Sequence, residues 1–377
     1  MRILHLVSST DRRGAQIFAS DLVGALAASD VDQHVVALRG PAGAPTPFAA
    51  PLSELVPDGP AGRFDGRIRR GLAAAVSSGR PDVIQAHGGE ALKYAIPATL
   101  RRRIPVVYRR IGSTPAWASS AAQRRLYASL ARRAAAVVAV SEATREEART
   151  LLRVPADRLV TIPNAVDARR LAVEVDRGGV RRALGVAAEA PLVVSVGALT
   201  WEKDPLGQVE IAAHVLRRVP EATFLLVGAG PLREEVEAAI AVRGLAGRIL
   251  VLGVREDVPD LLAASDVLVL ASSTEGSPAV VIEAGLLGLP VAAYAIGGVP
   301  EIVEDGRTGV LVPAGDRERL AAEVAALLVD PDRRAAMGAA GSARCRGAFE
   351  IGAVAPRYLE VYERVAGPRV GSASGAR

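Results

Sequence analysis

The stretch that decides the fold runs from Ala264 to Glu304 and reads ASDVLVLASSTEGSPAVVIEAGLLGLPVAAYAIGGVPEIVE. Residues 267–270 form a short apolar run that predicts a buried parallel strand. Residues 279–285 are typical of a helix, with Pro278 at its first position, and residues 290–294 predict the next strand. This succession of strand, helix and strand indicates an α/β fold with parallel sheets.

Two carboxylates occupy special places in this stretch. Glu275 lies in the loop at the carboxyl end of the predicted strand, where open parallel sheets bind their ligands. Glu283 follows eight residues later, about two helical turns on, so it is expected to face the same crevice. Spacing alone is explained equally well by a solvated loop acid and a partly buried helix acid.

Length and composition bound the class of protein. At 377 residues the chain is long enough for two or three domains. The one cysteine, Cys345, rules out an internal disulfide and suits a reducing compartment. The start of the sequence lacks the apolar core of a signal peptide, and no uninterrupted apolar run approaches the length of a membrane span. We therefore expect a cytoplasmic protein.

The charge is distributed unevenly along the chain. Residues 1–170 contain 25 basic and 14 acidic side chains, whereas the remainder contains 21 and 27. A basic first half predicts an anionic partner, such as the inner face of a cell membrane, a lipid phosphate or an acidic glycan. Nucleic acid is disfavoured because no binding module accompanies the charge and only 3% of residues are aromatic. A solvated face decorated by arginine-rich coding bias is the alternative.

Lysine is rare in this chain, which makes the two lysines informative. Among 46 basic residues only Lys93 and Lys203 are lysine. Where arginine is the usual cation, a lysine can mark a site that needs a compact ammonium group. Lys203 lies in a motif described below, whereas Lys93 lies in none and is explained by chance.

The opening stretch resembles the E-x7-E signature of the retaining glycosyltransferases of family 4, which have the GT-B fold. Residues 162–167, IPNAVD, are similar to that family's I-P-N-G-V-D segment, and residues 197–204 are similar to its G-R-L-x-x-E-K-G pattern. The best match covers residues 140–350. The resemblance implies an α/β GT-B protein, in which two Rossmann-like parallel-sheet domains face each other across a deep cleft. We expect an acceptor-binding domain, a nucleotide-sugar-binding domain, a helix that packs back on the first domain and a disordered tail, over residues 1–170, 171–350, 351–366 and 367–377.

The resemblance also implies roles for individual residues. In that family the first glutamate holds hydroxyls of the donor sugar, the second holds the ribose, and the lysine helps to hold the diphosphate. Here these are Glu275, Glu283 and Lys203, of which Lys203 and Glu275 are also the expected catalytic groups. The full expected donor-binding set is Gly14, Gly197, Lys203, Val254, Arg255, Glu275, Gly276, Ser277, Pro278 and Glu283.

Two departures from the family pattern affect the phosphate end of this site. Ala198 stands where the family has an arginine, so half of the expected cationic clamp is lost. Asp204 stands where the family has a glycine. Arg255 or an arginine of the first half is the expected compensation for the missing cation.

The first half offers fewer signals. His87 ends a predicted strand, where it is expected to serve catalysis and acceptor contacts; a capping or solvated histidine is the alternative. Ile111 stands where family members often have a histidine. Arg109 and Arg110 follow a strand predicted over residues 104–108 and are assigned to an anionic acceptor.

The predicted activity is that of a hexosyltransferase. It transfers a sugar, with retention, from a UDP- or GDP-sugar to an envelope lipid, a lipid-linked intermediate or a polysaccharide. We expect no permanently bound cofactor and no metal, because cations and backbone N–H groups stabilise the leaving phosphate. The expected partners are the nucleotide-sugar donor, a glycan or lipid-linked acceptor and an anionic membrane surface, with no nucleic acid. A sugar-nucleotide 2-epimerase and a non-catalytic binding protein on a degraded transferase scaffold are the alternatives.

Overall fold

In the computed structural model the chain forms two compact units. One unit comprises residues 1–164 together with 351–377, and the other comprises residues 165–350. The second unit begins at Ala165, inside the IPNAVD segment. The residues that the structure describes are 1–10, 14–40, 48, 50–56, 64–112, 120–171 and 174–367.

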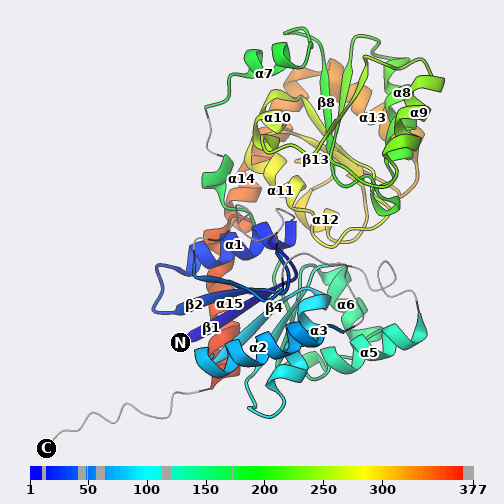
Figure 1. Ribbon diagram of the computed structural model, residues 1–377. Coiled ribbons are helices and arrows are strands. Elements are labelled where there is room, and N and C mark those ends of the chain that lie inside the picture. Colours follow the sequence, from blue (N-terminus) through cyan, green and yellow to red (C-terminus); the bar gives the residue numbers. More distant parts are fainter. Residues whose placement is uncertain are drawn as a thin grey trace, which may run out of the picture. The chain divides into compact units, whose positions relative to one another are not determined.

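The first unit alternates strands with helices (Figure 1). Its elements are β1 (Arg2–Val7), α1 (Gly14–Leu26), β2 (Asp32–Ala37), β3 (Leu52–Glu54), α2 (Gly66–Gly79), β4 (Val83–His87), α3 (Gly89–Thr99), β5 (Val106–Arg110), α5 (Ala121–Ala131), β6 (Ala136–Ala139), α6 (Glu142–Thr150), η1 (Ala156–Arg158), β7 (Leu159–Thr161) and the C-terminal α15 (Ile351–Ala366).

The second unit follows the same scheme. Its elements are η2 (Ala168–Leu171), α7 (Arg177–Ala183), β8 (Leu192–Val196), η3 (Trp201–Lys203), α8 (Pro205–Leu216), β9 (Thr223–Val227), α9 (Arg233–Val242), β10 (Ile249–Gly253), α10 (Val258–Ala264), β11 (Val267–Leu270), α11 (Ala279–Leu286), β12 (Val291–Tyr294), α12 (Val299–Ile302), β13 (Gly309–Val312), α13 (Arg317–Val329) and α14 (Pro331–Ala348).

The two sheets share one topology. The first has the strand order β3-β2-β1-β4-β5-β6-β7 and the second has β10-β9-β8-β11-β12-β13, and all the strand pairs are parallel. In each sheet the chain reverses its direction of progress beside the first strand. This topological switch point lies between β1 and β4 in one unit and between β8 and β11 in the other, and ligands of such sheets bind outside the carboxyl ends there.

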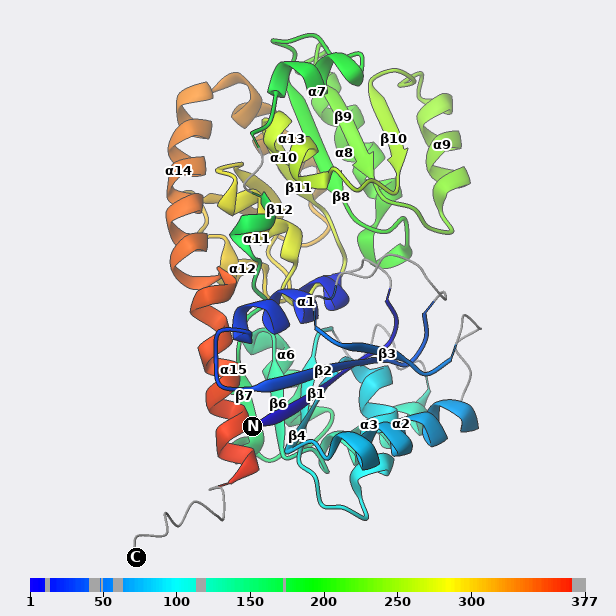
Figure 2. The same ribbon diagram turned by 60° about the vertical axis from the view of Figure 1, so that its left-hand side comes forward.

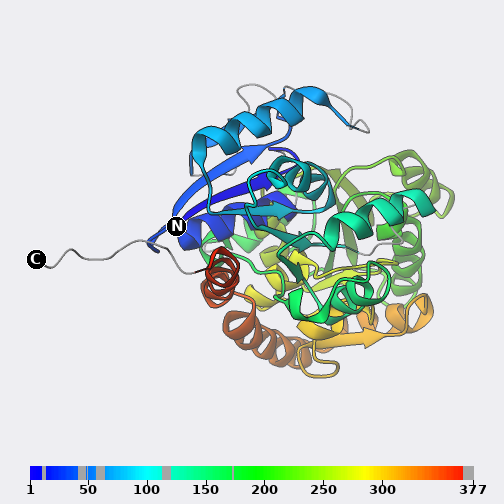
Figure 3. The same ribbon diagram turned by 90° about the horizontal axis from the view of Figure 1, so that it is seen from below.

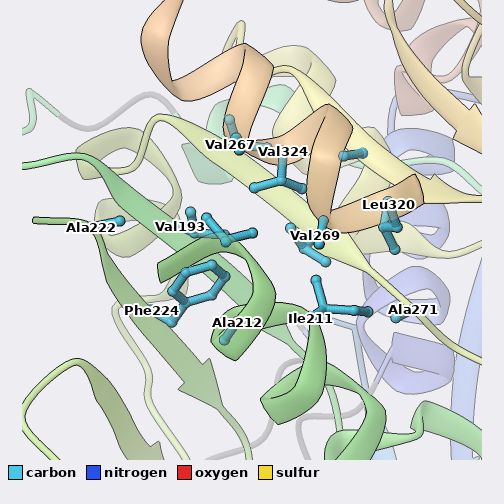
Figure 4. Packing of buried hydrophobic residues seen from close by; sticks show 14 of the residues in the cluster. Val193, Ile211, Ala212, Ala222, Phe224, Val267, Val269, Ala271, Leu320 and Val324 are labelled. Atoms are coloured by element: carbon cyan, nitrogen blue, oxygen red, sulfur yellow. The ribbon is translucent and has the colours of Figure 1, made fainter. Parts of the chain in front are cut away.

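Helices cover both faces of each sheet (Figure 2). In the second unit, α8, α9 and α13 bury apolar side chains on one face, while α10, α11 and α12 bury theirs on the other. Figure 4 shows the first of these cores, where Phe224 of β9 and Val193 of β8 pack with side chains of α8 and α13. Sheets buried on both faces explain why their strands read as continuous apolar runs.

The helix α15 completes the first unit. Its Tyr358 and Tyr362 are each 0% exposed, and the Tyr358 ring lies 5.6 Å from the ring of Phe18 in α1. Figure 3 views α15, drawn in red, along its axis. The structure therefore places α15 against α1 on one face of the sheet, whereas α2, α3, α5 and α6 pack on the other.

The structure differs from the sequence analysis at three elements. β3 was not predicted as a strand, because its three half-exposed residues give no apolar run. β5 continues through Arg109 and Arg110, which were predicted to follow the strand, because charged residues normally end a strand prediction. Pro278 caps α11 rather than forming its first residue.

Candidate active site

Lys203 is placed by the connection between β8 and α8. The turn begins at Gly197, whose N–H donates to the carbonyl of Val227 at the end of β9 at 2.9 Å. Lys203 ends the short helix η3, and its carbonyl accepts a hydrogen bond from the Gln208 side chain at 2.7 Å. The lysine backbone is therefore fixed from both the sheet and the following helix.

Glu275 reaches the same place from β11. Its Oε1 lies 2.5 Å from Lys203 Nζ, with side chains 7% and 29% exposed respectively. The two residues come from the strands that flank the switch point, 72 positions apart in the sequence. This ion pair brings together a cation suited to phosphate and an acceptor suited to hydroxyl groups.

The backbone around Glu275 is tightly packed. Gly297, after β12, has φ 51°, and a Cβ there would lie 1.8 Å from the Glu275 carbonyl oxygen. Ser273 donates from its backbone N–H to the Glu202 carbonyl at 2.8 Å, which joins the Glu275 loop to the Lys203 loop. Glycine at position 297 is thus required by both its conformation and the close approach.

Glu283 lies in α11, the helix that follows the Glu275 loop. Its carboxylate is 3.6 Å from the guanidinium of Arg170 in η2, and the side chains are 14% and 30% exposed. Gly276, Ser277 and Pro278, which precede α11, are buried. Backbone N–H groups at a helix start favour an anion, and contact between the start of α11 and the donor phosphate stays a prediction.

Asp204 adopts a conformation that side chains rarely take, with φ 42° and ψ 57°. Its carboxylate accepts a hydrogen bond from the Gly207 N–H at 3.1 Å and one from Arg317 at 2.8 Å. Arg317, at the start of α13, also donates to Glu210 of α8 at 2.7 Å. The departure from the family glycine is therefore matched by a helix cap and an ion pair. Arg317 carries no sequence signal, because its partner lies 113 residues away.

Val254 and Arg255 follow β10, the edge strand of the sheet. Val254 is 78% exposed, and Arg255 donates to the Asp257 carboxylate at 2.7 Å. Arg255 can therefore replace the cation that the family has at position 198 only if its ion pair with Asp257 opens. That Arg255 takes over this role stays a prediction.

In the first unit, His87 belongs to a buried pair. Its Nε2 lies 3.3 Å from Nδ1 of His5, and His5 Nε2 lies 3.1 Å from the Gln33 side-chain oxygen. Burial lowers the pKa of His5 to about 4 and holds the pKa of His87 well below its usual value. Both rings are therefore neutral at pH 7, and a neutral imidazole can act as a base. However, His87 is only 3% exposed, so a substrate has little access to it. A catalytic role for His87 remains a prediction.

Arg109 and Arg110 point into the first unit rather than to solvent. Arg109 is 1% exposed, donates to Asn164 at 2.8 Å and lies 3.7 Å from the centre of the Phe18 ring. Arg110 is 0% exposed and is bonded to the carboxylate of Glu147 and to a backbone carbonyl of α6. Arg109 Nε and Nη1 and Arg110 Nη1 are buried without a hydrogen-bond partner among the described residues, and the acceptor role of these two residues stays a prediction.

Gly14 begins α1 and is exposed, and a Cβ there would have nothing within 4 Å. Packing therefore does not require a glycine at position 14, and the expected contact of Gly14 with phosphate remains a prediction.

Among the described residues there is no cluster of three or more His, Cys, Asp or Glu side chains that could hold a metal ion. Within the same residues, no helix is both long and apolar enough to cross a membrane.

Two Rossmann-like parallel-sheet units in one chain are the architecture of the GT-B glycosyltransferases, and this chain has that architecture. Two family models match the chain, glycosyl transferases group 1 over residues 176–344 and glycosyltransferase family 4 over residues 12–170. The chain belongs to this family of retaining, nucleotide-sugar-dependent glycosyltransferases.

Known relatives support that assignment. The alpha-D-kanosaminyltransferase of Streptomyces kanamyceticus is 29% identical over 293 residues, 76% of this chain and 71% of that enzyme. The GDP-mannose-dependent alpha-(1-6)-phosphatidylinositol monomannoside mannosyltransferase of Mycolicibacterium smegmatis is 34% identical over 197 residues, and this alignment spans 50% of this chain and 51% of that enzyme. The crystal structure of Anabaena HepE in complex with UDP and glucose has a TM-score of 0.83 and 26% identity, and it covers 96% of this chain and 99% of that one.

Proposed function

We propose that the second unit binds a nucleoside-diphosphate sugar and that Lys203, Glu275 and Glu283 divide the donor among them. The observation that carries this proposal is the Lys203–Glu275 ion pair at 2.5 Å, beside the switch point of the sheet. Lys203 holds the diphosphate, Glu275 the hydroxyls of the transferred sugar and Glu283 the ribose. Gly197, Gly276, Ser277 and Pro278 contribute backbone and side-chain groups, and Val254 and Arg255 lie beside the base.

The chemistry follows from where charge develops. As the bond between the anomeric carbon and the phosphate oxygen breaks, positive charge develops on the sugar and negative charge on the leaving diphosphate. A preorganised ammonium beside the phosphate stabilises that negative charge, an effect worth about 2.7–4 kcal/mol per group. Lys203 supplies it without a metal in this proposal. The acceptor hydroxyl then adds to the same face of the sugar, and the leaving phosphate takes its proton.

The ion pair also predicts how donor binding begins. Before the donor binds, Glu275 neutralises Lys203, so the diphosphate must draw the ammonium away from this carboxylate. Lys203 is 29% exposed and can turn toward the diphosphate, whereas the Glu275 side chain is only 7% exposed. Opening the pair therefore requires the sugar hydroxyls to replace the ammonium as partners of the buried carboxylate. Glu275 is thereby released to accept hydroxyl hydrogen bonds from the sugar, and diphosphate binding is coupled to sugar recognition.

The acceptor is proposed to be an envelope lipid, a lipid-linked intermediate or a polysaccharide. Exposed arginines lie on α2 and α5, helices that pack on the same core of the first unit. One relative is named for a phosphatidylinositol mannoside acceptor, which is an anionic lipid. Both observations support a protein that works in the cytoplasm at the inner face of an anionic membrane.

Nucleotide binding by matched variants tests the division of roles. We expect UDP or GDP to bind more weakly to Glu283→Gln, because the ribose contact is shared by every nucleotide ligand. Glu275→Gln should bind the free diphosphate no more weakly, because Lys203 is released from the ion pair. Its turnover should fall, since the lost contact is made to the reacting sugar. Lys203→Ala should lower turnover by roughly two to three orders of magnitude.

Glu202→Gln is the control, because only its backbone carbonyl joins the two loops. Identical binding and turnover profiles for Glu275→Gln and Glu283→Gln would refute the division of roles. Absence of UDP and GDP binding in the unmodified protein would instead favour the hypothesis of a non-catalytic protein, which the departures at Ala198 and Ile111 motivate. Release of a rearranged sugar without any acceptor would identify an epimerase.

A further inference from the structure

The other lysine of the chain, Lys93, lies beside the switch point of the first sheet. It belongs to α3, which follows β4, and β4 is paired with β1 at that point. Arg39 arrives from the opposite side, two residues after the end of β2. The carboxylate of Glu90 joins them, at 2.6 Å from Arg39 Nη1 and 4.0 Å from Lys93 Nζ. We refer to Arg39, Glu90, Lys93 and Phe64 as the acceptor-edge cluster.

One buried donor of this cluster, on Arg39, has no hydrogen-bond partner in the part of the chain that the structure describes. Arg39 is 8% exposed, and its Nη2 is buried without a hydrogen-bond partner. Leaving a buried donor unsatisfied costs about 1–3 kcal/mol, so such a group indicates an absent acceptor. Two cations also share the single carboxylate of Glu90. Burial lowers the pKa of Lys93, Glu90 acts against this, and the neighbouring Arg39 adds to it, so Arg39 and Lys93 lie close enough to act on one another.

An exposed aromatic ring borders these charges. Phe64 is 58% exposed, and its ring lies 5.9 Å from the ring of Tyr94 in an edge-on arrangement. Lys93 Nζ lies 5.5 Å from the centre of the Phe64 ring and 4.8 Å from that of Tyr94. A large ring left open beside a cation offers an apolar platform together with a charge, the combination that binds a sugar ring with an acidic substituent.

Groups for hydroxyl binding lie next to Arg39. A Cβ at Gly40 would approach the Thr10 hydroxyl oxygen to 2.7 Å and the Glu54 carboxylate to 2.5 Å, so both side chains border the backbone of Gly40. The Thr10 oxygen is buried without a partner. Thr10 follows β1, and thus residues after three adjacent strands converge at one edge of the sheet.

We propose that the acceptor-edge cluster is the acceptor subsite of the first unit and takes a sugar or polyol that carries a carboxylate or phosphate group. The acidic group lies between Arg39 and Lys93, and the ring lies on Phe64. This proposal rests on the proposed glycosyltransferase function, and it names a more accessible place than Arg109 and Arg110, which are 1% and 0% exposed. It also gives a role to Lys93, whose ammonium lies 5.5 Å and 4.8 Å from the centres of the Phe64 and Tyr94 rings.

The test measures binding of small acidic sugars with the donor site blocked. With saturating UDP present, the Kd values of glucuronate, glucose 6-phosphate and glucose are measured by calorimetry or ligand-observed NMR. We expect an acidic probe to bind at least 10-fold more tightly than glucose. Lys93→Met should lose that preference at least 10-fold, and Phe64→Ala, at an exposed position, should weaken glucuronate, glucose 6-phosphate and glucose alike. Arg101→Met, which removes an exposed arginine elsewhere in this unit, should change nothing.

The outcomes separate the sources of the acidic group and the two proposals. A preference for glucuronate alone supports a carboxylate, and a preference for glucose 6-phosphate alone supports a phosphate. Acidic probes that bind no better than glucose, or that bind Lys93→Met and Phe64→Ala as they bind the unmodified protein, would overturn the subsite. UDP affinity should be equal in all of these variants. Failure of UDP to bind the unmodified protein would contradict the donor site while leaving the probe measurements interpretable.

Discussion

The contact between Asp204 and Arg317 makes a strong prediction about how Lys203 is positioned. A residue other than glycine in the left-handed conformation costs roughly 1–2 kcal/mol. The cap that Asp204 gives to α8 offsets about 1 kcal/mol. Its ion pair with Arg317, at 2.8 Å and with side chains 29% and 39% exposed, adds at most about 1 kcal/mol after solvent screening. The cost of the left-handed conformation is thus offset by the helix cap and the ion pair together. Removal of either stabilising contact should make the position of Lys203 less well defined.

Arg317→Met should therefore destabilise the loop conformation that positions Lys203 by about 1 kcal/mol. The population of that conformation, and with it kcat/KM for the donor, should fall roughly 5-fold. Asp204→Gly should be nearly neutral on its own, because glycine adopts the left-handed conformation freely and caps almost as well. In the Asp204→Gly background, Arg317→Met should cost less than about 2-fold, since no strained residue remains to be held.

The assay is a double-mutant cycle on donor kcat/KM and UDP affinity, with urea unfolding to record stability. Arg319→Met, two residues further along α13 and exposed, is the matched control. The positioning argument requires a coupling of about 1 kcal/mol between the two substitutions. Additive losses in kcat/KM, or losses that merely follow the free energy of unfolding, would refute it.

Two further predictions concern the first unit. The folded-state pKa of His5 is about 4, below its ordinary value of 6.5, so the unfolded chain takes up a proton first as the pH falls. Stability should be complete above pH 7, and His5 alone should lower it by roughly 2 kcal/mol at pH 5. Urea midpoints should show this, and His5→Gln should reduce the dependence to the part contributed by His87, whose pKa is also lowered. The basic first half predicts flotation with acidic liposomes that falls steeply with salt, because exposed charges are screened within about 8 Å at physiological ionic strength. Equal binding to neutral and acidic liposomes would remove the membrane argument.

Some of the site was predictable because its signals are local. Glu275 and Lys203 each follow an apolar run at a strand end, and in an open parallel sheet such positions gather at one edge. The strand order was predictable only by resemblance, since pairing between parallel strands leaves no mark in the sequence. The ion pair between these two residues required the structure, because 72 positions separate them.

The first unit was harder to predict for a physical reason. Arginine in a strand normally indicates an exposed end, yet Arg109 and Arg110 are buried because Asn164 and Glu147 supply distant partners. Lys93 was attributed to chance, although it lies beside Glu90 and over two aromatic rings. Polar residues of this kind reveal their role only through partners that tertiary structure brings to them.

The sequence by itself determined the alternation of strands and helices, the α/β class and the stretch that contains the two glutamates. These depend on apolar periodicity and on turn residues, which act over a few positions. Tertiary structure alone decided which charges meet. It joined Lys203 to Glu275, Asp204 to Arg317 and Arg39 to Glu90, each across tens of residues. Parallel strands are linked by long connections, so the groups that converge at their carboxyl ends are necessarily far apart in the chain.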